Sequence, residues 1–369
     1  MSGGRQIRVV VVDDSALMRA MLRRAIEGAD DLVCVGQASD AAEGREMIRT
    51  LNPDVITLDV EMPGMNGLEF LHKIMTLRPT PVIMVSTLTQ SGTETSLAAL
   101  EAGAVDVVAK PSGADAPAFA ERLRATVRVA AGARVTRRKP AAPVAAVAKP
   151  KAPPPVSTRF ETSLIAIGAS TGGVQALGAL FEVLPYPMPP IVIAQHMPPG
   201  YTGRFAMRLN NSLRYHVAEA RDGERLGPGM IRIAPGDRHL VIKRTGQGLE
   251  SFLDDAPPVT GHKPSVDMLF RSVAALPQDV VRRTLGLILT GMGRDGAEGL
   301  AMMRKAGSFN LGESAKSCTV YGMPRAAAEV GAVHEELELK ALAARLPELV
   351  QTRNPAQSTP AARRNAANI

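Results

Sequence analysis

Leu164-Ile-Ala-Ile-Gly-Ala-Ser-Thr-Gly-Gly173 is an apolar run that leads directly into a glycine-rich turn. Such a run is typical of a strand that is buried on both faces, and Gly-x-Ser-x-Gly predicts a strand-to-helix turn with Ser170 at its tip. A hydroxyl in that position is exposed and can act as a nucleophile. The stretch therefore predicts an α/β fold and serine-based acyl transfer.

Two further polar residues follow apolar runs in the same region. His196 comes directly after the run 190–195, and Asp295 lies in the glycine-framed loop 290–296 after another run. Because the carboxyl ends of parallel strands meet at one edge of a sheet, we expect Ser170, His196 and Asp295 to lie together as nucleophile, base and orienting carboxylate. The order Ser…His…Asp differs from that of the α/β hydrolases, so that fold is not implied.

The sequence leaves structural alternatives open for these residues. The glycine-rich turn could bind a dinucleotide, although the GxGxxG spacing is missing. A single histidine at a strand end is often structural, and Asp295 could cap the helix expected from Ala297. Ser265 and Asp267 are interpreted as an ordinary helix start. The remaining histidines have no comparable setting: His72, His216, His239, His262 and His334.

Composition limits the possible partners. The chain has 369 residues, 45% apolar and 21% charged, which allows two domains with a core each. Its net charge of +7 is accounted for by residues 131–160, which carry seven basic side chains and no acidic one. The aromatic share is 3%. A basic, base-stacking face is therefore not predicted, and we expect no nucleic-acid partner.

Cellular location follows from what the sequence lacks. Cys34 and Cys318 form no CxxC pair, the amino-terminal stretch has no signal-peptide layout, and no apolar run approaches a membrane span. We therefore expect a cytoplasmic protein without disulfides and without membrane insertion.

Hydrophobic patterning divides the chain into four parts. Residues 1–130 and 161–350 each alternate short apolar runs with amphipathic segments, which predicts two doubly wound parallel sheets, a flavodoxin-like one and then a Rossmann-like one. Residues 131–160 are rich in Ala, Pro, Lys and Arg and predict a flexible linker, and the polar residues 351–369 predict a disordered tail. Strands expected in the second region are 164–168, 191–195, 230–234, 239–242 and 285–290.

Polar residues end four of the strands expected in residues 1–130: Asp13 and Asp14, Asp59, Ser86 and Thr87, and Lys110. Three carboxylates in one crevice repel one another unless a hard cation lies among them, and Mg²⁺ prefers such oxygen ligands. We therefore predict a Mg²⁺ site at Asp13, Asp14 and Asp59, with Asp59 as the phosphoryl acceptor. Lys110 would neutralise the phosphate, Ser86 could hydrogen-bond a phosphate oxygen, and Thr87 is expected to contact the phosphate beside it.

This pattern resembles a response-regulator receiver domain across the whole first region. The motifs are Asp13-Asp14-Ser15, Thr57-Leu-Asp59-Val-Glu-Met-Pro63 and Lys110-Pro111. The resemblance implies phosphorylation by a histidine kinase. One departure is Val107, which stands where receivers usually carry an aromatic switch residue.

The second region resembles the catalytic domain of the chemotaxis protein-glutamate methylesterases. The motifs are Gly168-Ala-Ser-Thr-Gly-Gly173, Gln195-His-Met-Pro198, Ala234-Pro-Gly236, Pro264-Ser-Val-Asp267, Gly291-Met-Gly-Arg-Asp-Gly296 and Tyr321-Gly-Met-Pro-Arg325. The run Phe309-Asn-Leu-Gly-Glu313 departs from many relatives.

This second resemblance implies that the chain hydrolyses γ-glutamyl methyl esters of chemoreceptors at receptor arrays, releases methanol and deamidates receptor glutamines. It also implies that the Met292 N–H group binds the oxyanion with Thr171 nearby, and that no cofactor serves the catalytic domain. Phosphorylation of Asp59 would move an inhibitory receiver off the triad. Two alternatives stay open: a receiver-regulated protein-glutamine amidase, and a non-enzymatic response regulator, which would need a DNA-binding motif after the linker.

Overall fold

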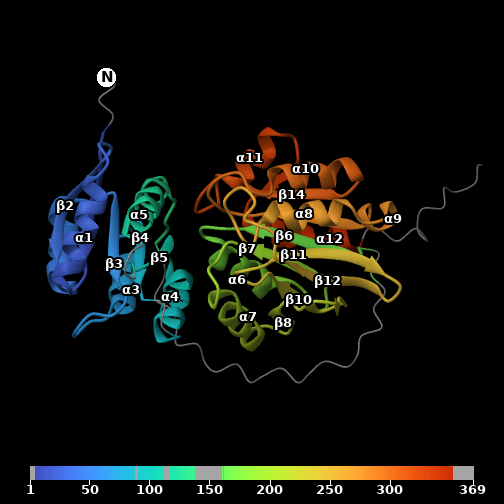
Figure 1. Cartoon of the computed structure of the whole chain (residues 1–369), viewed down its shortest axis with the longest axis horizontal. Helices are drawn as coiled ribbons and strands as arrows, with labels where there is room; N and C mark the ends of the chain where they lie inside the picture. The colour runs from blue at the N-terminus through green and yellow to red at the C-terminus, as the bar shows by residue number, and fades with distance from the viewer. Residues whose placement is uncertain (1–4, 88–89, 112–115, 138–159, 161, 352–369) are drawn as a thin grey trace, which may run out of the picture.

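The computed structural model describes residues 5–87, 90–111, 116–137, 160 and 162–351. Most of the expected linker and the tail from 352 lie outside the described residues. The described chain forms two α/β halves, coloured blue to teal and green to red in Figure 1. No helix in the described ranges is long and apolar enough to cross a membrane.

The first half is a five-stranded parallel sheet in the order β2-β1-β3-β4-β5. Successive valines of the first strand point to opposite faces, and both faces are covered by helices. Helices α1 and α5 pack on one face, whereas α2, α3 and α4 pack on the other. The elements are β1 Ile7–Val12, α1 Ala16–Glu27, β2 Leu32–Ala38, α2 Ala41–Leu51, β3 Val55–Asp59, α3 Gly67–Leu77, β4 Val82–Ser86, α4 Gln90–Ala102, β5 Asp106–Ala109 and α5 Ala116–Ala131.

The second half contains a seven-stranded parallel sheet in the order β15-β14-β13-β6-β7-β10-β8. Its strands are β6 Leu164–Ala169, β7 Ile191–Gln195, β8 His216–Glu219, β10 Met230–Ile233, β13 Thr284–Ile288, β14 Phe309–Glu313 and β15 Glu335–Leu337. Its helices are α6 Gly173–Val183, α7 Tyr201–Ser212, α8 Val266–Ala274, α9 Gln278–Val281, α10 Ala297–Ala306, α11 Met323–Glu329 and α12 Leu339–Gln351.

The predicted fold class is confirmed, with one correction in the second half. The expected strand 239–242 exists, but it belongs to a separate antiparallel sheet in the order β11-β12-β9, with β11 His239–Thr245, β12 Gly248–Asp254 and β9 Glu224–Arg225. Five strands were not predicted from the sequence: β8, β9, β12, β14 and β15. Three of these are only two to four residues long, and β14 buries Asn310 and Glu313, so none shows a continuous apolar run.

The two halves touch through α4 and the segment that leaves α5. Leu97 of α4 is fully buried within the core of the second half, against α6 and α7. Glu94 and Glu101 of α4 pair with Arg204 and Arg208 of α7 at the edge of this contact. Beyond α5, the Arg134 N–H group donates to the Thr319 carbonyl at 2.9 Å. The first half therefore sits against the carboxyl edge of the second sheet, where the site lies.

Candidate active site

Ser170 lies in the turn between β6 and α6. The Ser170 N–H group donates to the Thr290 carbonyl at 3.0 Å, and the Gly173 N–H group donates back to the Ser170 carbonyl at 2.8 Å. Gly172 has φ +81°, which favours glycine, and a Cβ there would lie 2.6 Å from Thr319. The glycines are therefore required to close the turn that presents the serine.

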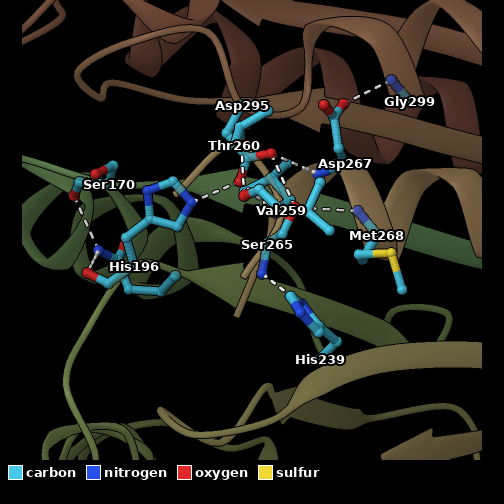
Figure 2. Close-up of polar contacts among 12 residues, drawn as sticks. Ser170, His196, His239, Val259, Thr260, Ser265, Asp267, Met268, Asp295 and Gly299 are labelled. Carbon is cyan, nitrogen blue, oxygen red and sulfur yellow. Dashed lines mark hydrogen bonds and ion pairs between the residues drawn. The ribbon is translucent and has the colours of Figure 1, made fainter. Parts of the chain in front are cut away.

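His196 and Asp295 meet beside this turn. His196 Nε2 lies 2.8 Å from Asp295 Oδ2, and the aspartate side chain is fully buried. Figure 2 shows Ser170 on the side of the imidazole ring that faces away from Asp295. The other ring nitrogen, Nδ1, is buried without a hydrogen-bond partner among the described residues. The free nitrogen is the one available to take a proton from the serine.

Gln195 connects the serine and the histidine. Its side-chain amide nitrogen donates to the Ser170 carbonyl at 2.9 Å and to the His196 carbonyl at 3.2 Å. This role of Gln195 was not predicted from the sequence, because it depends on the side-by-side pairing of β6 and β7.

Asp295 does not cap α10, as one alternative expected. That helix begins after Gly296 and has no side-chain cap. Instead, Asp295 accepts hydrogen bonds at the start of α8, from Ser265 Oγ at 2.9 Å, Val266 N at 2.7 Å and Asp267 N at 3.1 Å (Figure 2). The segment interpreted as an ordinary helix start therefore holds the carboxylate of the site.

These contacts set the charge of Asp295. Burial alone would raise its pKa, but the hydrogen bond to His196 and the N–H groups of α8 outweigh burial and lower the pKa to about 2. The carboxylate is therefore ionised throughout the neutral pH range and fixes the proton of the imidazole on Nε2.

The expectation that no other histidine belongs to the site is wrong, because His262 lies against His196. Its ring stacks on the His196 ring, with centroids 3.9 Å apart and planes inclined by 7°. Burial, together with the neighbouring His196, lowers the pKa of His262 to about 4. A neutral ring therefore covers one face of His196 and restricts its orientation.

Thr171 and Met292 lie on the same cavity as Ser170. This cavity of about 630 Å³ is lined by residues of both halves, including Asp106, Val107 and Arg122 from the first. The Thr171 hydroxyl donates to Asp106 Oδ2 at 2.9 Å, and the Met292 side chain is 41% exposed. The predicted oxyanion residues thus line the same cavity as the serine, and residues of the first half form part of the wall of that cavity.

The predicted acidic cluster of the first half also assembles. One oxygen each from Asp13, Asp14 and Asp59 lies within 4.8 Å of the others. Lys110 Nζ lies 2.8 Å from Asp59 Oδ2 and 3.1 Å from Asp13 Oδ2. Burial, and secondarily the charge on Asp13, raises the pKa of Asp59 although Lys110 lowers it. Burial would lower the pKa of Lys110, but the two carboxylates outweigh it and raise that pKa.

Ser86 and Thr87 differ in their surroundings. Ser86 is buried, and its hydroxyl contacts the carbonyl oxygens of Thr87 at 3.1 Å and Gly92 at 3.4 Å. Thr87 is exposed at the end of β4. In this arrangement the Ser86 hydroxyl is bonded to backbone rather than to the acidic cluster.

Comparisons with known proteins agree with this geometry. The family model for the CheB methylesterase matches residues 165–346, and the one for the response regulator receiver domain matches residues 9–121. A protein-glutamate methylesterase/protein-glutamine glutaminase 1 of Rhizobium johnstonii is 51% identical over 91% of this chain and 94% of its own length. A protein of the same name from Caulobacter vibrioides is 49% identical over 94% of this chain and 99% of its own.

Among solved structures, the CheB methylesterase catalytic domain of Thermotoga maritima aligns with 51% of this chain and 98% of its own, with 37% identity and a TM-score of 0.48. The identity and coverage of the full-length relatives decide the family. This chain belongs to the protein-glutamate methylesterases in which a receiver domain precedes a CheB methylesterase domain.

Proposed function

We propose that this protein is a phosphorylation-activated serine hydrolase that removes methyl groups from glutamate methyl esters of chemoreceptors and deamidates receptor glutamines. The observation that carries the proposal is the buried His196–Asp295 pair beside Ser170, with Nδ1 of the imidazole left for the serine. The names of the relatives supply the substrate class.

Acylation follows from the placement of these groups. His196 Nδ1 takes the Ser170 proton as the hydroxyl oxygen attacks the ester carbonyl, and Asp295 stabilises the imidazolium through Nε2. The negative charge on the carbonyl oxygen would be bound by the Met292 N–H group and the Thr171 hydroxyl. His196 then gives its proton to the methoxy group, and methanol leaves the acyl-enzyme.

Deacylation reverses these roles with water as the nucleophile. His196 Nδ1 takes a proton from water, the hydroxide attacks the acyl carbon, and Ser170 is released with its proton restored. The product is a glutamate γ-carboxylate. A glutamine side chain would pass through the same acyl-enzyme, with ammonia as the leaving group, so one site serves both reactions.

The acidic cluster fits a magnesium ion. Three carboxylate oxygens, two of them from buried side chains, are the hard ligands that Mg²⁺ prefers. Asp13, Asp14 and Asp59 would hold it, and the bound ion would supply positive charge for an incoming phosphoryl group. Asp59 is the acceptor in this proposal, Lys110 balances phosphate charge, and Ser86 turns from backbone carbonyls to a phosphate oxygen.

The phosphodonor in this proposal is a chemotaxis histidine kinase, and the site of action is the cytoplasmic receptor array. Regulation is steric: the receiver residues that line the active-site cavity limit access to Ser170, and phosphorylation shifts the population toward an open arrangement.

Methanol release from methylated receptor, measured with and without a small phosphodonor, tests the proposal. Release should rise with the phosphodonor, and Ser170→Ala and His196→Ala should each lose most of it, because these residues act as a unit. Wild-type release by Ser170→Ala would reject the assignment of the nucleophile.

A further inference from the structure

Asp106 of the receiver reaches the nucleophile turn. It is the first residue of β5, and its Oδ2 accepts the hydrogen bond from Thr171, the residue after Ser170. Its Oδ1 accepts the Val107 N–H group at 2.8 Å, which fixes the carboxyl orientation. A carboxylate therefore lies bound beside the serine, inside the cavity where the substrate must enter.

Several groups around this carboxyl oppose the cost that burial imposes on its negative charge. Thr171 precedes the amino-terminal end of α6, where the helix dipole attracts anions. The Gln175 amide in the first turn of α6 donates to the Ala104 carbonyl at 3.2 Å, so the receiver is bonded at this helix end twice. Burial raises the pKa of Asp106, and the Val107 N–H group and then the Thr171 hydroxyl oppose that rise. The subsite thus offsets part of the cost of placing a carboxylate there.

The same chemical group is the product of the proposed reaction. Hydrolysis of a glutamate methyl ester leaves a γ-carboxylate next to Ser170. The Thr171 hydroxyl has one proton, so a hydroxyl that donates to Asp106 cannot donate to an ester oxygen. The closed form therefore lacks one of the two proposed oxyanion donors, in addition to having a covered serine.

We propose that the Thr171 hydroxyl, at the amino-terminal end of α6, forms a carboxylate-binding subsite, which Asp106 fills in the closed form and the γ-carboxylate of the demethylated glutamate fills in the open form. This inference rests on the proposed function. Asp106 is then a product mimic built into the receiver, and it competes with product for the Thr171 proton.

The strand that carries Asp106 also leads to the phosphorylation site. Lys110 directly follows β5 and is bound to Asp59 and Asp13, so the four-residue strand joins the two contacts. Val107, the position at which an aromatic switch is absent, lies next to Asp106 and lines the same cavity. A change of charge at Asp59 can therefore reach Asp106 through the strand itself.

Binding of N-acetylglutamate α-amide, whose only carboxylate is the γ one, tests the subsite by calorimetry on the unphosphorylated full chain. Asp106→Ala should bind it about tenfold more tightly than wild type, as expected for removal of one charge-assisted hydrogen bond from the competing group. Asp106→Asn keeps an acceptor oxygen and should fall between them. For the neutral N-acetylglutamine α-amide, the increase in affinity from wild type to Asp106→Ala should be smaller.

Two further variants separate this subsite from a general loosening of the receiver. Glu101→Gln weakens the partly exposed α4–α7 ion pair and should change binding by less than about twofold. Adding Thr171→Val to Asp106→Ala should abolish the gain for the carboxylate. Equal binding by wild type and Asp106→Ala, an equal gain for the neutral amide, or a gain that survives Thr171→Val would each overturn the proposal.

Methanol release from the same proteins separates this inference from the proposed function. Unphosphorylated Asp106→Ala should release methanol about tenfold faster than unphosphorylated wild type. No release by any variant, phosphorylated or not, would reject the proposed function. If Asp106→Ala keeps normal release with the phosphodonor and its basal rate is unchanged, the proposal that Asp106 mimics the product is rejected, whereas the proposed function stands.

Discussion

Asp295→Asn is the perturbation whose outcome the structure defines most closely. Each carboxylate oxygen accepts two hydrogen bonds: Oδ1 from Ser265 Oγ and Asp267 N, and Oδ2 from His196 Nε2 and Val266 N. In the variant, the amide nitrogen must face one of these pairs of donors. If it faces His196, it forces the imidazole proton onto Nδ1, which then cannot act as the base.

The magnitude follows from the low pKa of this carboxyl. A pKa lowered from 3.8 to about 2 corresponds to roughly 2 kcal/mol of stability contributed by the ionised form. Because the folded-state pKa is lowered, this stability is present above about pH 4 and is lost as the pH falls toward 2. The variant should therefore be less stable by roughly 2 kcal/mol at pH 7, and the difference should shrink below pH 4.

Asp295→Asn should affect turnover more strongly than it affects the free energy of unfolding. Loss of the orienting carboxylate costs about 10⁴-fold where the imidazole takes the wrong tautomer. Urea unfolding at pH 7 and pH 3, together with methanol release at pH 7, measures both effects. Ser265→Ala is the control: it removes one donor to Asp295 and the cap of α8, which accepts the Met268 N–H group, but leaves the charge, and it should cost about 1 to 2 kcal/mol with turnover within about tenfold. An Asp295→Asn protein with wild-type turnover would refute this account of the site.

Three other outcomes follow from the same structure. A phosphodonor with Mg²⁺ should label Asp59 and raise methanol release, and a chelator should block both; intact-mass spectra that show phosphate on Asp59→Ala would move the acceptor elsewhere. A fragment from about residue 157 onward should be at least as active as the unphosphorylated full chain, because no catalytic residue is assigned to the receiver; a folded but much less active fragment would mean that the receiver assists catalysis. His262→Phe keeps a flat ring against His196 and should retain most turnover, whereas His262→Ala should lose about fivefold; equal rates in the two variants would show that stacking does not position the imidazole.

The sequence alone determined that the chain forms two parallel α/β sheets and which residues follow the strands it revealed, although β8, β14 and β15 of the second sheet were not evident from it. The βα alternation is local, and a parallel sheet places all its strand ends on one side. Ser170 and His196 each directly follow a strand of the second sheet, and Asp295 lies in the loop after β13. Asp59 ends β3 and Lys110 follows β5, so both stand at the carboxyl edge of the first sheet for the same reason, although β4 lies between the two strands. Periodicity and the positions of strand ends were therefore sufficient to predict these residues as members of the two sites.

Only the tertiary structure decided what surrounds them. His262 and Ser265 lie in a connection without periodicity between β12 and α8, and their contacts with His196 and Asp295 form only when that connection folds back over the sheet edge. Thr171 and Asp106 are 65 positions apart and belong to different halves, so no local pattern relates them. Such contacts depend on how whole layers pack, because a hydrogen bond between distant segments leaves no spacing in the sequence to read.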